Sequence, residues 1–194
     1  MKIVNVGYRS TNYYILADTS GSPRLLIDAG WPGTLPTMQH TCNVMGIKLS
    51  SIPYQLITHY HPDHAGLAQE LKHLGVHLII VDTQLVGIPL LRTYVKPQDK
   101  YIDIEIAGNT ILTVDESRPF LARIGIQGEI INTPGHSDDS ITLILDEGAA
   151  FTGDLTPPML VPHDPNDPAY QSWAAIRAKG ATTIYPGHGP PWNI

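Results

Sequence analysis

Cysteine, basic residues and long apolar runs are scarce in this sequence of 194 residues. The single cysteine, Cys42, excludes an internal disulfide, and we expect it to be a buried, unreactive thiol within a helix. Lys and Arg total 12 against 18 Asp and Glu, so the net charge of −6 offers no basic field to nucleic acid or anionic lipid. No apolar run reaches the roughly 18 residues that a membrane span needs, and the N-terminus lacks the apolar core of a signal peptide. We therefore expect a cytoplasmic protein without a nucleic-acid or membrane partner.

Short apolar runs alternate with helical patterns, which indicates a layered α/β protein in one domain, residues 1–194. The sequence predicts strands at residues 2–6, 13–17, 25–28, 55–58, 76–81, 102–106, 110–114, 129–132, 141–145, 150–152 and 182–185. It predicts helices at residues 35–46, 64–74, 83–91 and 168–179.

Two segments of the chain follow one plan. Residues 13–30 (YYILADTSGSPRLLIDAG) and 141–154 (ITLILDEGAAFTGD) each read as strand, polar turn, strand and aspartate. A helical pattern and then a short strand that leads into histidine follow each of them. This weak twofold repeat predicts two similar halves in which Asp28 matches Asp154 and His59 matches His188. Because few residues are identical between the copies, a chance similarity of two βα units is the alternative.

The segment THYHPDHAG, residues 58–66, holds three of the nine histidines and an aspartate within six positions. Residues i and i+2 of an extended chain point to the same face, so His59 and His61 can bind one metal ion. Pro62 ends the strand because it lacks an N–H and fixes φ. The turn that follows carries Asp63 and His64 to a neighbouring position, which predicts a second ion.

The other candidate ligands share one context, the end of a strand beside glycine or proline. They are His136 in NTPGHS, Asp154 in FTGDL and His188 in YPGHG. A carboxylate has two oxygens, so Asp154 could contact both ions at once. The seven candidates then divide into His59, His61 and His136 for one ion and Asp63, His64 and His188 for the other, with Asp154 bridging.

In order and spacing, THYHPDHAG, TPGHSDDS, TGDL and YPGHG resemble the successive motifs of the metallo-β-lactamase superfamily over nearly the whole chain. The resemblance implies a four-layer αββα sandwich, classed as α/β or in some schemes α+β, with the metal site at the edge between two halves. It supports the same seven ligands. Where the family usually has TPGHTPGS, this chain has Asp138 and Asp139 in place of Pro-Gly, which adds negative charge beside a ligand and leaves the local turn open.

Nitrogen and oxygen donors favour zinc, although iron, manganese or cobalt would accept the same ligands. With two such ions we expect a hydrolase of a small-molecule ester, thioester, lactone or related amide, in which a hydroxide held by the metals attacks the carbonyl. Asp63 is expected to orient that hydroxide and to carry a proton to the leaving group. The oligomeric state cannot be read from the sequence.

Five further residues are weaker candidates. We expect Asp28 to support a histidine or the loop from behind the ligands. Trp31 could contact substrate, and His163 could reach it, although simple exposure is the expected state of His163. Tyr60 and Tyr185 could donate to an oxyanion, although buried packing is the expected role of each.

The resemblance also leaves alternatives. Persulfide dioxygenases of the superfamily use one iron on the first three-histidine site, but the complete second set favours hydrolysis. Flavodiiron proteins carry Glu where His61 stands, so a redox role with two iron ions is disfavoured. We expect β-lactamase activity to be minor, because classes B1 and B2 place a cysteine near a ligand position where Asp154 stands, and class B3 lacks the bridging aspartate. Glyoxalase II-like thioesterases add a helical domain after the last histidine, whereas this sequence ends at Ile194, and the net charge disfavours the phosphodiesters that nucleases cleave.

Overall fold

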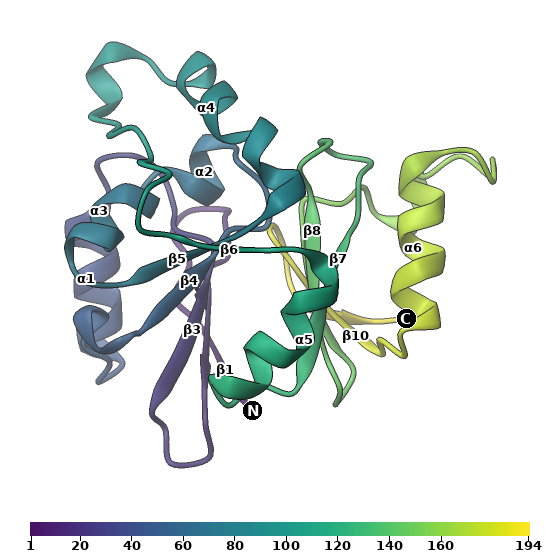
Figure 1. Cartoon of the computed structure of the whole chain (residues 1–194), viewed down its shortest axis with the longest axis horizontal. Helices are drawn as coiled ribbons and strands as arrows, with labels where there is room; N and C mark the ends of the chain where they lie inside the picture. The colour runs from purple at the N-terminus through teal and green to yellow at the C-terminus, as the bar shows by residue number, and fades with distance from the viewer.

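The computed structural model describes all 194 residues and contains two β-sheets that face each other between outer helices (Figure 1). The first sheet has the strand order β1-β2-β3-β4-β5-β6 and the second the order β11-β10-β9-β8-β7. The strands are β1 (Lys2–Asn5), β2 (Tyr14–Ala17), β3 (Pro23–Ile27), β4 (Tyr54–Leu56), β5 (His77–Val81), β6 (Thr110–Leu112), β7 (Gly128–Asn132), β8 (Ile141–Leu145), β9 (Ala149–Gly153), β10 (Thr183–Pro186) and β11 (Trp192–Asn193). The helices are α1 (Leu35–Val44), α2 (Pro62–Ala65), α3 (Ala68–His73), α4 (Ile88–Tyr94), α5 (Val114–Arg123) and α6 (Pro168–Ala178), with short 3-10 helices η1 (Leu49–Ser51), η2 (Asp82–Val86), η3 (Pro97–Asp99) and η4 (Pro158–Leu160).

Three apolar layers hold the two sheets and their helices together. Successive side chains of a strand point to opposite faces, so β3 directs Leu26 toward α1 and α3 but Leu25 and Ile27 toward the second sheet. On the far side of the second sheet, Trp173 and Ile176 of α6 complete the third layer. The predicted four-layer αββα sandwich is therefore confirmed (Figure 1).

The two halves share one strand plan, as the sequence repeat predicts. In the first half β1, β2 and β3 pair antiparallel, and after α1 the strand β4 pairs parallel to β3. In the second half β7, β8 and β9 pair antiparallel, and after α6 the strand β10 pairs parallel to β9. Asp28 follows β3 and Asp154 follows β9, whereas His59 and His188 follow β4 and β10. Because the carboxyl ends of parallel strands lie at one edge of a sheet, each half brings an aspartate and a histidine to that edge.

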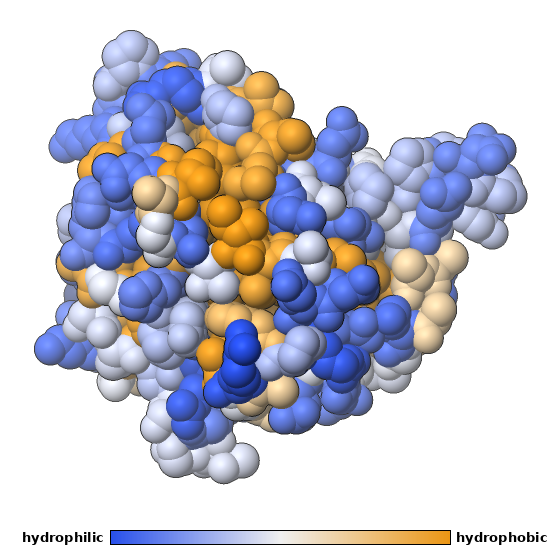
Figure 2. Space-filling model, viewed as in Figure 1, coloured by the Kyte–Doolittle hydropathy of each residue, from blue (hydrophilic) through white to orange (hydrophobic).

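The strand predicted at 102–106 is absent. Side chains of α3 bind the backbone of Glu105 instead, because Lys72 Nζ donates to its carbonyl at 2.6 Å and its N–H donates to Gln69 Oε1 at 3.0 Å. Ile104 is buried, but Ile102 and Ile106 are 42% and 41% exposed. Figure 2 shows an apolar surface over the region of α4 and β6. The alternating isoleucines therefore reflect one buried contact rather than a sheet.

Two predicted helices are each divided in the structure, and one predicted strand runs into a helix. The helix predicted at 64–74 is divided by a turn at Gly66 and Leu67 into α2 and α3, and the one at 83–91 is divided into η2 and α4. The strand predicted at 110–114 ends at Leu112, and the helix α5, which the sequence analysis did not predict, begins at Val114. A capping box in which Glu116 Oε2 accepts the N–H of Thr113 at 2.9 Å marks its start.

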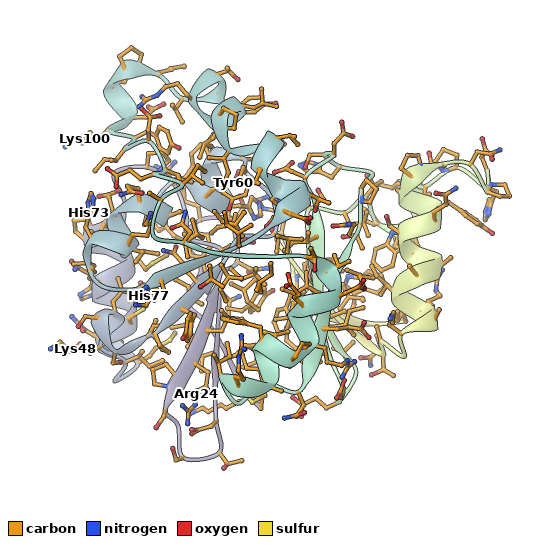
Figure 3. All side chains as sticks on the ribbon, viewed as in Figure 1. Arg24, Lys48, Tyr60, His73, His77 and Lys100 are labelled. Carbon is orange, nitrogen blue, oxygen red and sulfur yellow. The ribbon has the colours of Figure 1, made fainter.

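Side chains outside the sheet edge differ in their burial. His73 and His77 are exposed at the periphery, whereas Tyr60 lies in the interior (Figure 3). The Cys42 thiol is fully buried on α1. None of the helices has the length and apolar character that crossing a bilayer requires.

Candidate metal centre

Three imidazoles converge where the loop after β4 meets the loop after β7. His59 Nε2 lies 3.1 Å from His61 Nδ1, and His136 Nε2 lies 3.0 Å from the same atom. The candidate ligand atoms of the three residues all lie within 4.8 Å of one another. We call this group the first cluster, and it has the donors that one metal ion with three histidine ligands requires.

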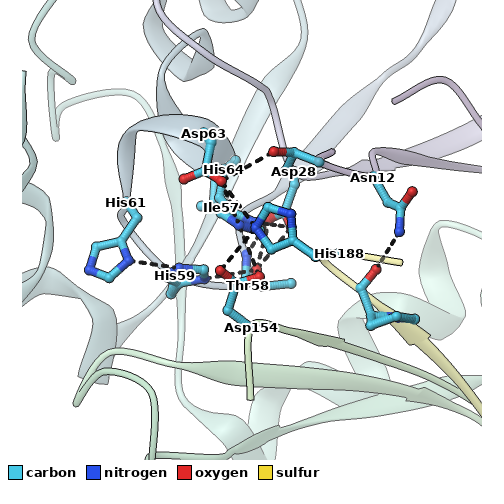
Figure 4. A network of polar contacts seen from close by, with 12 residues as sticks. Asn12, Asp28, Ile57, Thr58, His59, His61, Asp63, His64, Asp154 and His188 are labelled. Carbon is cyan, nitrogen blue, oxygen red and sulfur yellow. Dashed lines mark hydrogen bonds and ion pairs between the residues drawn. The ribbon is translucent and has the colours of Figure 1, made fainter. Parts of the chain in front are cut away.

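A second cluster, consisting of Asp63, His64, Asp154 and His188, lies beside the first (Figure 4). His188 Nε2 is 3.2 Å from both Asp63 Oδ2 and Asp154 Oδ2. The short helix α2 begins at Pro62 and turns Asp63 and His64 away from His61. The structure thus brings together all seven residues that the sequence analysis selected. Six of them are divided as predicted, and Asp154 is grouped with the second cluster.

The Asp154 carboxylate lies between the clusters. Its Oδ2 is 3.2 Å from His188 Nε2 and 3.8 Å from His136 Nε2, and its Oδ1 is 3.2 Å from His64 Nε2. One side chain therefore faces donors of both clusters, which is the geometry that a bridging ligand needs.

Two buried polar atoms in this region have no hydrogen-bond partner: His64 Nε2 and Asp154 Oδ1. They face each other at ion-pair distance, but without the angles of a hydrogen bond. Because buried polar atoms are almost always satisfied, a cation bound between the two atoms would satisfy both of them. The donors of both clusters could therefore hold metal ions.

The protonation of two of the clustered histidines follows from burial and charge. Burial opposes the charged form of His64, but the carboxylates of Asp28 and Asp154 outweigh it and raise the pKa of His64 to about 10. Burial, together with the neighbouring imidazoles, holds the pKa of His59 well below its ordinary value. Thus His64 is protonated at neutral pH and offsets part of the neighbouring negative charge, whereas His59 is neutral.

Asp28 supports both clusters from behind. Its Oδ2 accepts from His64 Nδ1 at 2.8 Å, and its Oδ1 accepts the N–H of Thr58 at 2.7 Å. The Thr58 hydroxyl donates to the same carboxylate and lies 3.3 Å from His59 Nδ1. These contacts turn the Nε2 atoms of His59 and His64 toward the centre. Asp28 does this from a left-handed backbone conformation with φ of 64°, which Asp and Asn tolerate better than most residues.

Replacing Asp28 by Asn should lower metal affinity roughly 10–100-fold, because an amide cannot accept from both Thr58 and His64 as a carboxylate does. Asn keeps the shape and tolerates the left-handed backbone, so the fold should persist. Competition with a coloured chelator measures the affinity, and circular dichroism checks the fold. Asp115→Asn, at an exposed position of α5, is the control with the same change of charge. Equal affinities in the two variants would contradict this role of Asp28.

The Asp138-Asp139 pair, which replaces the family's Pro-Gly, has two different environments. Asp139 is buried, and its Oδ2 accepts the N–H of Tyr60 at 2.7 Å. It therefore holds the loop between His59 and His61, and the local turn is anchored rather than loosened. Asp138 is exposed beside His136.

Several supporting residues were missed by the sequence analysis. The buried Gln84 donates from Nε2 to the carbonyls of Ile57 at 2.8 Å and Asp139 at 3.3 Å. The Thr11 hydroxyl donates to Asp63 Oδ2 at 3.2 Å across 52 positions of sequence. His188 Nδ1 donates to the carbonyl of Ser10 at 2.7 Å. No local pattern marks these contacts, because each joins segments that meet only in the folded chain.

The other weak candidates belong to neither cluster. Tyr60 is buried in the first apolar layer, where its hydroxyl has no partner and burial raises its pKa. The Tyr185 ring stacks on Phe151 with centroids 5.0 Å apart, so both tyrosines pack as expected. His163 lines a separate cavity of about 140 Å³. Trp31 is 39% exposed and lines none of the cavities described here.

Two cavities open beside the centre. The larger, of about 460 Å³, is lined by Tyr60, His61, Val86, Gly87, Leu90, Tyr94, His136, Ser137, Asp138 and Asp139, and we call it the α4 cavity. The smaller, of about 210 Å³, is lined by His136, Gly153, Asp154, Leu155, Pro157, Pro186 and His188, and we call it the His188 cavity. His136 lines both, so the clusters lie between two open spaces.

Gly187 leaves no room for a side chain beside the second cluster. A Cβ at this position would lie 2.4 Å from Asp154 Oδ1 and 2.6 Å from His64 Cε1. Gly187→Ala should therefore displace a proposed ligand and cost at least about 100-fold in kcat/KM, since misplacement by about 1 Å has that effect. Gly189→Ala is the control, because nothing lies within 4 Å of that Cβ although φ is 83°. Steady-state kinetics with metal analysis tests this, and equal losses in both variants would refute it.

Comparison with known proteins agrees with this geometry. The family model described as the metallo-beta-lactamase superfamily matches residues 6–188. The Beta-lactamase-like protein 2 homolog of Caenorhabditis elegans is 32% identical over 185 residues, covering 94% of this chain and 57% of that protein. An atrochrysone carboxyl ACP thioesterase of Aspergillus fumigatus is 29% identical over 188 residues, covering 93% and 51%. The chain spans about half the length of the curated relatives it matches.

A solved structure shows the same fold. The crystal structure of a metallo-beta-lactamase family protein from Thermus thermophilus superposes with a TM-score of 0.77 at 20% identity, covering 99% of this chain and 74% of that one. The fold, the arrangement of the seven residues and the family match over residues 6–188 agree. This chain belongs to the metallo-beta-lactamase superfamily.

Proposed function

We propose that this protein is a dinuclear metal-dependent hydrolase of a small-molecule carbonyl substrate. The single observation that carries the proposal is the position of the Asp154 carboxylate, whose oxygens face imidazoles of both clusters. A stabilising metal site would be closed, whereas His136 and His188 have side chains 29% and 40% exposed toward open cavities. An open position beside the ligands is typical of catalytic sites.

Among esters, thioesters, lactones and related amides, we propose a thioester as the preferred substrate. The similarity to the Aspergillus fumigatus thioesterase supports this choice. We propose zinc as the metal, because the seven candidate ligands are five histidines and two aspartates and so offer only nitrogen and oxygen donors.

Different residues of the site are assigned different roles in the proposed reaction. When bound, divalent ions here supply a Lewis acid and lower the pKa of a coordinated water to about 7. We assign to Asp63 the role of accepting a proton and passing it to the leaving group, and the partial exposure of its carboxylate to solvent supports this role. The Thr11 hydroxyl, which donates to Asp63 Oδ2, keeps this carboxylate in position.

Elemental analysis combined with a substrate panel tests the proposal. We expect two zinc ions per chain and faster turnover of thioesters than of esters, lactones or β-lactams. A chelator should abolish turnover and added zinc should restore it. One iron per chain with oxygen consumption on a persulfide would instead establish the dioxygenase alternative. Metal that stabilises the fold without any turnover would overturn the proposal in favour of a structural site.

A further inference from the structure

We propose that the α4 cavity binds the acyl portion of the substrate and that Asp138 selects against acyl groups that end in a carboxylate. The substrate class is then a thioester of an apolar acyl group that is neutral or positively charged. This inference rests on the proposed hydrolase function and names the substrate of the same site.

One wall of the cavity is an apolar stripe. Val86 is the last residue of η2, whereas Leu90 and Tyr94 are four residues apart on α4, a spacing that places their side chains on one helical face. Their side chains are 63%, 52% and 55% exposed, and all three line the cavity. Large apolar side chains that stay exposed along a concave surface are typical of a ligand-binding wall.

The stripe leads directly to the first cluster. The ring of Tyr94 lies edge-on against His61, with centroids 5.0 Å apart, and both His61 and His136 line the cavity. A volume of about 460 Å³ lies within the range of sites for small molecules. A group that lies on the stripe therefore ends at the proposed metal ligands.

The position of Asp63 sets the direction of the substrate. Asp63 belongs to the second cluster, with His188, and the leaving group must approach it to receive a proton. The His188 cavity opens on this side. The acyl portion then extends the opposite way, past the first cluster and into the α4 cavity.

The other wall of the α4 cavity is acidic. Asp138 is exposed on this wall, while the carboxylate of Asp139 is already bound to the N–H of Tyr60. No Lys or Arg lines the cavity. An acyl group with a terminal carboxylate would bring like charges together with no Lys or Arg side chain to balance them, and salt would weaken that repulsion.

Binding of thioether analogues, which cannot be hydrolysed, tests the inference. Three analogues of equal length that end in methyl, ammonium or carboxylate are titrated into zinc-loaded protein by calorimetry. At low ionic strength we expect the carboxylate form to bind about tenfold more weakly than the other two, a difference that high salt reduces. Asp138→Asn should remove most of this difference, whereas Asp115→Asn, with the same change of net charge, should preserve it.

A second matched pair tests the apolar wall. Val86→Ser should weaken binding of the methyl analogue roughly fivefold. Valine would bury about half of its apolar side chain against the analogue, and serine would lose this contribution. Val44→Ser, at a 73% exposed position of α1, should leave binding unchanged. If each analogue bound all four variants with the same affinity, the inference would be wrong even where the protein hydrolyses thioesters. The predicted binding pattern without any turnover would instead sustain the cavity assignment and refute the proposed function.

Discussion

Asp154→Asn should lower kcat/KM at least about 1,000-fold and reduce the metal content from two ions per chain to one. The amide keeps the size of the side chain but removes the negative charge and one oxygen that face His64, His136 and His188. The first cluster retains three imidazoles and should still hold an ion, whereas the second loses a carboxylate. A loss of several kcal/mol of transition-state stabilisation corresponds to this change in rate, since each 1.36 kcal/mol is a factor of ten.

Mass spectrometric metal analysis and steady-state kinetics on one preparation measure both effects. Asp115→Asn serves again as the matched control and should retain two ions and wild-type turnover. If Asp154→Asn also kept two ions and its activity, the carboxylate would not bridge, and the division of the site into two coupled clusters would be wrong.

Asp63→Asn should lower kcat roughly 100- to 10,000-fold on a thioester with a strongly basic alkyl thiolate as leaving group, the range that a positioned proton donor provides. The loss should be much smaller on an aryl thioester, whose thiolate leaves without protonation. Both losses include any effect on metal binding, so the difference between the two substrates isolates the proton transfer.

The measurement compares kcat for the two leaving groups in wild type and Asp63→Asn, with metal content determined in parallel. Equal losses on both substrates would show that Asp63 acts only by holding the second ion. Thr11→Val tests the support of Asp63, because it removes the hydroxyl that donates to Asp63 Oδ2 and leaves all the proposed ligands unchanged.

The arrangement of the site could be predicted because its residues occur in short sequence motifs at the ends of predicted strands. THYHPDHAG follows a strand, and Asp28 and Asp154 each follow one of the repeated pairs of strands. Because the carboxyl ends of parallel strands lie at one edge of a sheet, these residues are expected at that edge. The structure places all seven within two adjoining clusters, and their binding of metal stays a prediction that the experiments above test. The two similar halves could likewise be predicted from the order of the strands and helices, although few residues are identical between the two copies.

What the sequence could not predict depends on contacts between distant segments. Gln84 joins η2 to the loop after β4, and Ser10 accepts from His188 across nearly the whole chain. The prediction at 102–106 was wrong because the pattern of isoleucines does not say whether a neighbouring strand is available. The α5 helix was missed although Thr113 and Glu116 form a capping box, because Pro119 interrupts its pattern.

Anomalous diffraction from crystals of zinc-loaded protein tests the central claim most directly. We predict two peaks per chain, one among His59 Nε2, His61 Nδ1 and His136 Nε2, and the other among the side chains of Asp63, His64 and His188, with Asp154 between them. A single peak, or a peak outside these two clusters, would contradict a dinuclear centre.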